Sequence, residues 1–263
     1  MSHLNFKNRL QYYGMQLSKS EQKIADFIIK HHKEVVLYSS DDLAQKNGTS
    51  KSTISRFCKK LGYRNYNEFL TLLSSENEPQ PLIDDPVQKI MHYCNQVYLS
   101  SSELIDINVL NQFIHQIKSA NQILICGIGS SGLTAIELSM RLVHMGLVAK
   151  AITDSHLMKA QTQRFSSKDL LIAISTSGTT QEVIEACNIA KEIGTPICAI
   201  TKTNYTPLTN LSETTIFVSD VSQINDPQFI NSQLSFLYLI DILSYILLLD
   251  PEYSDNFNKF PNS

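Results

Sequence analysis

The strongest constraint on the fold is an alternation of two kinds of segment between residues 122 and 219. Short runs that are apolar at nearly every position alternate with longer stretches whose apolar residues recur at helical spacing. Strands apolar at every position are buried on both faces, and such strands joined by helices form parallel sheets. This part of the chain therefore predicts an α/β domain with a doubly wound parallel sheet. The expected strands are 122–128, 148–153, 169–175, 196–201 and 214–219, and the expected helices between them include 133–146, 155–165 and 181–194.

The first 75 residues differ in both pattern and charge. They are rich in helix formers and short turns, which predicts an all-α domain. They hold 12 Lys and Arg against 6 Asp and Glu, whereas the remaining residues hold 10 against 19. The net charge of the whole chain, −3, hides this contrast. Opposite charge on two parts of one chain indicates that only the basic part meets a polyanion.

A linker is expected between these two parts. Residues 76–86, ENEPQPLIDDP, hold three prolines and four acids and few apolar side chains. The sequence therefore predicts a helical domain over 1–75, a linker over 76–86, an α/β domain over 87–250 and a tail over 251–263. The α/β domain is expected to open with helix over 87–118, broken near 100–102.

The segment 39–63 has the order of parts found in a helix-turn-helix. Ser40 is expected to cap a short helix, and Asn47-Gly48 is a turn signal. Ser50 can then cap a second helix, Lys51–Leu61, which Gly62 would end. Such a second helix fits the major groove of DNA, with its first residues near base edges and flanking cations near phosphates.

The second helix has one apolar face and one basic face. Ile54, Phe57 and Leu61 share a face that the core would bury. A solvated polar surface is the alternative for the other face, but the cap, the tight turn and the basic helix occur together, which favours DNA binding. The residues expected at base edges are Lys51, Ser52, Thr53 and Arg56, and those expected at phosphates are Ser50, Ser55, Lys59 and Lys60.

Two loops rich in hydroxyl side chains follow expected strands, GIGSSG at 127–132 and STSGTT at 175–180. A helix is expected directly after each loop. In a parallel sheet both loops lie at the carboxyl edge, where helix N-termini attract anions. Capping would explain one Ser or Thr per helix, but five hydroxyls surround Gly178. We therefore expect the two loops to hold one phosphate.

A dinucleotide site is an alternative for the first loop. GIGSSG fits the GxGxxG pattern, and Asp154 lies about 20 residues further on, where a ribose-binding acid is expected. This alternative is an NAD-binding, redox-sensing regulator. It gives the second hydroxyl loop no role.

The chain resembles the MurR/RpiR family of bacterial transcriptional regulators from about Leu17 to about Leu249. The N-terminal resemblance to an RpiR-type helix-turn-helix lies in LSKSEQKIADFII, DDLAQKNGTSKSTISRFCKKLGY and NYNEFL. The resemblance to a SIS (sugar isomerase) domain lies in ILICGIGSSGLTAIELSMRLVHMG and IAISTSGTTQEVIEACNIAKEIGTPICAIT. It implies a DNA-binding domain over 1–75 and a phosphosugar-binding domain over 87–250.

The resemblance also implies which residues hold the ligand. In SIS domains the two loops grip the phosphate of a phosphosugar, and a segment matching TDSH (153–156) lines the sugar pocket. The implied ligand residues are Ser130, Ser131, Ser175, Thr176, Ser177, Thr180 and His156. Gln233 stands near a position that is usually arginine in the family, which leaves the identity of the sugar open.

Sensing and catalysis are both compatible with such a site. A phosphosugar isomerase-like enzyme would need an acid and a base beside the sugar. The candidates are Glu137, His144, His156, Glu182 and Glu185, and no pattern brings two of them together. The DNA-binding domain favours a sensor rather than an enzyme. The resemblance implies a regulator of genes for sugar uptake or catabolism.

The expected partners are a double-stranded DNA operator, a phosphosugar effector and a second copy of the chain. Helices at 87–117 and 232–249 are the expected dimer surface, and the pairing of dimers into tetramers is left open. The five cysteines show no metal spacing, so we expect no metal, no cofactor and reduced thiols in a cytoplasmic protein. The apolar run 234–249 is short for a membrane span and contains Asp241.

Overall fold

The computed structural model describes residues 5–14, 17–76, 85–202, 206–219 and 233–259. The chain divides into two compact units, Met1–Glu103 and Leu104–Ser263. The sequence predicted that the α/β domain begins at residue 87 and includes the helix that follows. In the structure this helix, Pro86–Leu104, belongs almost entirely to the first unit, which ends at Glu103. Residues 77–84 of the predicted linker lie outside the described residues.

The first unit is helical in every element the structure describes. Its helices are α1 (Phe6–Tyr13), α2 (Lys19–Lys30), α3 (His32–Val35), α4 (Ser40–Lys46), α5 (Lys51–Lys60), α6 (Tyr66–Glu76) and α7 (Pro86–Leu104). Its core joins apolar side chains from α1 through α6, including Phe6, Ile24 and Phe57. The rings of Phe6 and Phe69 pack edge to face at 5.8 Å.

Two predicted helix boundaries in this region were wrong. Ser39, not Ser40, caps α4, because the Asp42 amide donates to Ser39 Oγ and the Asp42 carboxylate accepts from the Ser39 amide. This reciprocal capping box fixes the start of the helix one residue earlier than predicted. The predicted break near 100–102 is also absent, since α7 continues to Leu104 and Asp106 then caps the next helix, α8.

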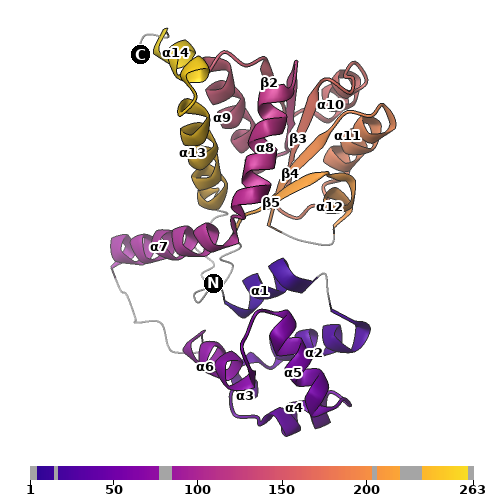
Figure 1. Cartoon of the computed structure of the whole chain (residues 1–263), viewed down its shortest axis with the longest axis vertical. Coiled ribbons are helices and arrows are strands. Elements are labelled where there is room, and N and C mark those ends of the chain that lie inside the picture. The colour runs from indigo at the N-terminus through magenta and orange to yellow at the C-terminus, as the bar shows by residue number, and fades with distance from the viewer. Residues whose placement is uncertain (1–4, 15–16, 77–84, 203–205, 220–232, 260–263) are drawn as a thin grey trace. The chain divides into compact units, whose positions relative to one another are not determined.

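The second unit is built on a five-stranded sheet whose described strands are all parallel (Figure 1). The strand order is β2-β1-β3-β4-β5. The strands are β1 (Ile123–Cys126), β2 (Ala149–Ile152), β3 (Leu170–Ile174), β4 (Ile197–Thr201) and β5 (Thr214–Phe217). The helices are α8 (Ile107–Ser119), α9 (Ser130–His144), α10 (Ser155–Thr162), α11 (Gln181–Glu192), α12 (Pro207–Leu211), α13 (Leu234–Leu248) and α14 (Pro251–Lys259).

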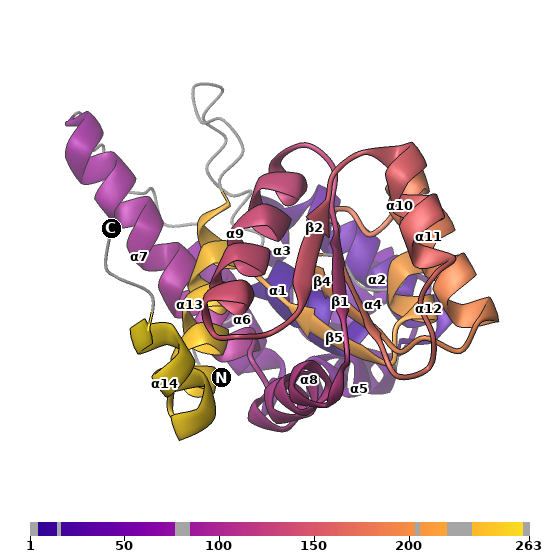
Figure 2. The same cartoon turned by 90° about the horizontal axis from the view of Figure 1, so that it is seen from above.

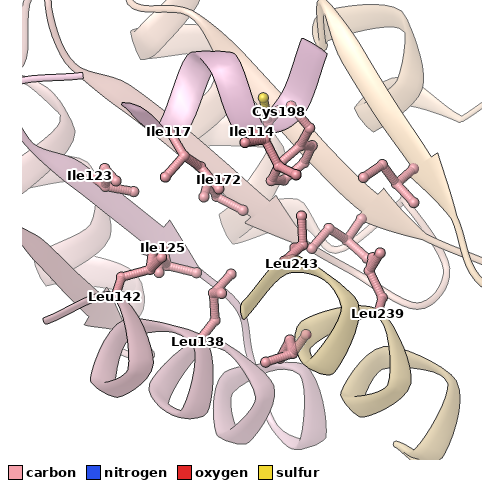
Figure 3. Packing of buried hydrophobic residues seen from close by; sticks show 14 of the residues in the cluster. Ile114, Ile117, Ile123, Ile125, Leu138, Leu142, Ile172, Cys198, Leu239 and Leu243 are labelled. Atoms are coloured by element: carbon pink, nitrogen blue, oxygen red, sulfur yellow. The ribbon is translucent and has the colours of Figure 1, made fainter. Parts of the chain in front are cut away.

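Helices cover both faces of this sheet, as the apolar strands predicted. Ile123 and Ile125 of β1 pack into one cluster with α8, α9 and α13, and Figure 3 shows Leu138 and Leu243 among these side chains. Leu124 and Cys126 point to the other face, where they pack with α10, α11 and α12. Alternate residues of a strand face opposite sides, so a strand buried on both sides is apolar throughout. Figure 2 shows the two helical layers with the sheet between them.

The C-terminal part of the chain adds two helices to this unit. α13 buries Phe236, Leu239 and Leu243. Residues 251–259, expected to be a tail, form α14, which buries Tyr253; residues 260–263 lie outside the described residues. No single helix in the described parts has the length and apolar composition of a membrane span, although α13 and α14 together, bent by 104°, meet those two criteria.

Candidate functional site

The strand order of the sheet reverses at β1. From β1 the chain crosses one face to β2 on one side, and it then returns to β3 on the other side of β1. In open α/β sheets ligands bind where the strand order reverses in this way. β1 and β3 pair directly, with Cys126 beside Ala173, so the loops that follow them leave the sheet side by side.

The hydroxyl side chains of these two loops come together. Ser131 Oγ of the first loop lies 3.5 Å from Thr176 Oγ1 of the second. Within the second loop, Ser175 Oγ accepts a hydrogen bond from the Gly178 amide at 3.1 Å and lies 2.9 Å from Thr180 Oγ1. Ser177 Oγ accepts from the amide of Thr179 at 3.3 Å. The predicted juxtaposition of the two hydroxyl loops is therefore present.

The glycines of the loops allow close approach of the backbone. Gly178 has φ 66°, and a Cβ there would lie 2.3 Å from Thr206 Oγ1. A Cβ on Gly127 would lie 2.5 Å from the carbonyl oxygen of Ser131. Thr206 caps α12 and was not among the predicted site residues. The pair Thr206-Pro207 is a helix-start signal that could have located it.

Four helices start at this edge of the sheet, and they differ in how their first amides are satisfied. Asp154 caps α10 by accepting from the Leu157 amide, and Thr206 caps α12. In contrast, α9 and α11 have no side-chain cap, with Gly129 and Thr180 at their cap positions. The two uncapped helices are those that follow the hydroxyl loops. Their N-termini offer backbone donors and the positive ends of two helix dipoles to an anion.

The predicted ligand residues fall into three groups by exposure. Ser131 and Ser175 are buried. Ser130, Thr176 and Thr180 are half-buried, and Ser177 is exposed. His156 is also exposed, in the first turn of α10, which begins at the same edge of the sheet after β2. Contact of these residues with a ligand stays a prediction.

Gln233 lies next to the first turn of α9. Its Oε1 is 2.8 Å from Thr134 Oγ1, which in turn is 3.2 Å from the carbonyl oxygen of Ser130. Its Nε2 is buried and has no hydrogen-bond partner among the described residues. Gln233, which stands near a position that is usually arginine in the family, is therefore connected through Thr134 to the first loop.

Two carboxylates considered as general acids or bases pair with cations instead. Glu137 accepts from Arg141 Nε at 2.7 Å. Glu185 pairs with Lys159, and this hydrogen bond, with another from Gln181, lowers the pKa of the Glu185 carboxyl. A general acid would need a raised pKa. Asp154, the candidate ribose-binding acid, caps α10.

The cysteines are free, and Cys58, Cys126, Cys187 and Cys198 are buried. Burial raises the pKa of Cys58 to about 12, which disfavours the reactive thiolate. No group of three His, Cys, Asp or Glu side chains with metal-site geometry occurs in the described part of the chain. These four buried thiols pack within the hydrophobic cores.

The first unit has the geometry of a helix-turn-helix at α4 and α5. Gly48 turns the chain with φ 61°, and Ser50 caps α5 by accepting from the Thr53 amide at 3.3 Å. Ile54 and Phe57 of α5 and Leu61 at its C-cap are fully buried, as predicted. The first turn of α5 contains no acidic residue, so its N-terminus remains attractive to phosphate.

The opposite face of α5 is open to solvent. Ser52, Ser55, Arg56 and Lys59 are exposed, and Arg56 also reaches Thr53 Oγ1 at 3.4 Å. Lys51 is exposed too and pairs with Asp41 at 2.8 Å. An exposed pair of this kind contributes about 0–1 kcal/mol, so the contact with base edges predicted for Lys51 would lose little stability by separating it from Asp41.

Lys60 has a structural partner in the core of the domain. Its Nζ lies 2.7 Å from the buried carboxylate of Glu21, which also closes the capping box of α2. Burial raises the pKa of Glu21, but the hydrogen bonds from Lys60 and Ser18 outweigh it and hold the pKa below its usual value. The phosphate contact predicted for Lys60 would compete with this pair.

Two family models match the chain in the order that the structure shows. A helix-turn-helix domain of the rpiR family matches residues 4–80, and a SIS domain matches residues 116–243. The chain belongs to the RpiR family of helix-turn-helix regulators. This RpiR-family chain is thus a transcriptional regulator with a DNA-binding helix-turn-helix and a SIS domain.

Relatives of this RpiR-family regulator carry the same description. It is 28% identical to an uncharacterised HTH-type transcriptional regulator of Clostridium perfringens over 95% of this chain and 94% of that protein. It is 29% identical to YfhH of Escherichia coli, also an uncharacterised HTH-type transcriptional regulator, over 76% of this chain and 74% of that protein.

Two solved structures extend the comparison. The regulator is similar to the Vibrio vulnificus NanR protein complexed with ManNAc-6P, with 28% identity, a TM-score of 0.64 and coverage of 97% of this chain and 96% of NanR. It also matches the sugar isomerase domain of an RpiR transcription factor from Sphaerobacter thermophilus, with 15% identity and a TM-score of 0.61, over 66% of this chain and 96% of that domain. The second likeness concerns the fold.

Proposed function

We propose that this RpiR-family regulator senses a phosphorylated sugar at the carboxyl edge of β1 and β3, and that binding changes its affinity for operator DNA. The observation that carries the proposal is the pair of hydroxyl loops. The side chains of Ser131 and Thr176 meet between them, and each loop leads into a helix that has no side-chain cap. Hydroxyls and backbone amides bind phosphate without placing a second charge beside it.

An N-acetylated hexosamine 6-phosphate is the first ligand class to test. NanR, which is similar over 97% of this chain, binds ManNAc-6P. The phosphate would lie between the loops at 127–132 and 175–180, and His156 and Gln233 are the side chains proposed to meet the sugar. Gln233 is neutral, so it would contribute hydrogen bonds rather than charge.

Regulation would act through linkage between the ligand site and DNA binding. A ligand changes an equilibrium only by its difference in affinity for the two states. Two recognition helices of a dimer reach half-sites about 34 Å apart, so a change in their spacing changes operator affinity. We propose that α5 of each copy enters one major groove. The proposed role is sensing rather than catalysis.

Thermal unfolding of the purified protein against sugar phosphates tests the sensor. A ligand at about 100 times its Kd stabilises the folded protein by about 2.7 kcal/mol and raises the Tm. We expect a shift with one sugar phosphate and none with its unphosphorylated sugar. A shift with NAD alone would favour the dinucleotide alternative, and turnover of the sugar phosphate would favour an isomerase.

A loop variant distinguishes the phosphate site from any other site. Ser177→Ala combined with Thr180→Ala removes two hydroxyls of the second loop. We expect this variant to bind operator DNA as the wild type does but to lose the response to the sugar phosphate. A full response in the double variant would contradict the assignment.

A further inference from the structure

Lys202 lies beside the second hydroxyl loop. It directly follows β4, at the carboxyl edge of the sheet, and it is half-buried. Its amide donates to the carbonyl oxygen of Thr176 at 3.3 Å, and the Thr201 hydroxyl donates to the same oxygen at 3.4 Å. The Thr176 hydroxyl is the one that lies 3.5 Å from Ser131 Oγ. The backbone of Lys202 therefore contacts the residue at which the two loops meet.

The side chain of Lys202 extends from β4 to the first turn of α13. Its Nζ lies 5.8 Å from the centre of the Phe236 ring. Gln233, at the cap position of the same helix, bonds to Thr134. Thr134 in turn lies 3.2 Å from the carbonyl oxygen of Ser130 in the first loop. The ammonium group is therefore near a helix start that is connected to the first loop, while the Lys202 backbone contacts the second.

The charges at this edge of the sheet leave a bound phosphate without enough positive charge. The two hydroxyl loops contain no charged side chain. A phosphate ester carries about −1.5 to −2 charges near pH 7, and each helix N-terminus offers about +0.5. The starts of α9 and α11 thus offset about one negative charge. Glu182, in the first turn of α11, and Asp154, the cap of α10, add negative charge at the same edge.

Lys202 is the residue placed to supply the missing charge. No lysine or arginine occurs in the three residues after β1, β2 or β3, or in the two described residues after β5. Lys159 of α10 pairs with Glu185. A lysine carries three donors on a flexible stem, and its contact with an aromatic ring is weaker than a charge-assisted hydrogen bond to phosphate. The ammonium of Lys202 can therefore exchange the Phe236 ring for a phosphate oxygen.

We propose that Lys202 pairs with the phosphate of the sugar phosphate that this regulator senses. This inference rests on the proposed function, since it assigns a further residue and its charge to the same site. The hydroxyls and amides of the two loops fix the position of the phosphate, and Lys202 supplies the positive charge that they lack. Affinity for the ligand then depends on the charge of Lys202 and on the salt concentration.

Substitutions that separate the charge of this side chain from its packing test the proposal. Lys202→Met removes the charge and keeps an unbranched stem, Lys202→Gln removes the charge and stays polar, and Lys202→Arg keeps the charge. Lys168→Met is the matched control, because Lys168 is exposed two residues before β3, at the opposite end of the strands. Isothermal titration calorimetry measures the Kd of ManNAc-6P, and of any other sugar phosphate that raises the Tm of the wild type, at low and at physiological salt. Thermal unfolding without ligand checks that each variant is folded.

We expect Lys202→Met and Lys202→Gln to raise the Kd by about 10- to 100-fold, the effect of losing one hydrogen bond to a charged group. The Kd of both variants should also depend less on salt than the Kd of the wild type. Lys202→Arg should restore most of the affinity, and Lys168→Met should bind as the wild type does.

Equal Kd values for the wild type and the two uncharged variants would overturn this proposal and leave the ligand proposal intact. A loss of affinity that Lys202→Arg does not restore, with the salt dependence of the wild type, would also overturn it, because Lys202 would then act by packing against Phe236. A wild type that binds no sugar phosphate would overturn both proposals.

Discussion

Ser131 Oγ and Thr176 Oγ1 lie 3.5 Å apart, although the two residues are 45 positions apart in the chain. Ser131 lies in the first turn of α9, directly after β1, and Thr176 lies in the loop after β3. The contact exists because those strands are neighbours in the sheet, so the helices that follow both strands begin at the same edge of the sheet. Substitutions at this point therefore test the phosphate site directly.

Ser131→Ala should weaken binding of a sugar phosphate by about 10-fold, the loss of about 1.4 kcal/mol expected for one hydrogen bond to a charged group. Ser139→Ala is the matched control, because Ser139 is buried on the same helix two turns further along. Isothermal titration calorimetry gives both affinities. Equal Kd values for the two variants would remove Ser131 from the site.

Gly178→Ala should destabilise the protein and abolish ligand binding. An alanine there must adopt φ 66°, and its Cβ would lie 2.3 Å from Thr206 Oγ1. Gly194→Ala is the control, because Gly194 has φ 76° but open space around its Cβ. We expect Gly194→Ala to cost about 1–2 kcal/mol, the penalty of a left-handed alanine, and Gly178→Ala to cost about 2 kcal/mol more, since the overpacked loop must shift. Urea unfolding measures both, and equal costs would contradict this account.

Local patterns predicted much of the fold and of the candidate site. The five apolar runs predicted the strands of the sheet, and Ser50 was identified as the cap of α5. The position of both hydroxyl loops follows from the rule that parallel strands end at one edge. These features depend on neighbouring residues or on a general rule of topology.

The features that were missed depend on contacts distant in sequence or on competing local signals. Thr206 lies against Gly178 because α12 packs beside α11, which no local pattern encodes. The pair of Lys60 with Glu21 joins residues 39 positions apart, so Lys60 was assigned to the basic surface alone. At the start of α4 either Ser39 or Ser40 could cap the helix from the local sequence. Ser39 is the cap because Asp42 forms the reciprocal hydrogen bonds of a capping box with it.

Arg56→Ala and Lys60→Ala should have different effects, although both remove a cation from α5. Arg56 is exposed on the recognition face, so its loss should weaken operator binding by about 1–3 kcal/mol and leave the Tm unchanged. Lys60 pairs with buried Glu21, so its loss should lower the Tm. Fluorescence anisotropy with operator DNA and thermal unfolding, at one fixed salt concentration, measure both effects. An unchanged operator affinity in Arg56→Ala would count against the assigned DNA surface.

The Glu21 carboxylate should make the stability of the DNA-binding domain depend on pH. Its pKa is lowered in the folded protein, since the bonds from Lys60 and Ser18 outweigh the cost of burial. A lowered folded pKa means that this contribution is complete above the unfolded value of about 4.3 and is lost as the pH falls through the folded value.

Glu21→Ala should therefore cost about 1–3 kcal/mol at pH 7, from the cap and the ion pair together, and much less near pH 3. Urea unfolding of wild type and variant at both pH values measures the difference. Asp26→Ala is the control, because Asp26 is an exposed carboxylate on the same helix, α2. A pH-independent difference between wild type and Glu21→Ala would show that the carboxylate stabilises the helix by packing alone.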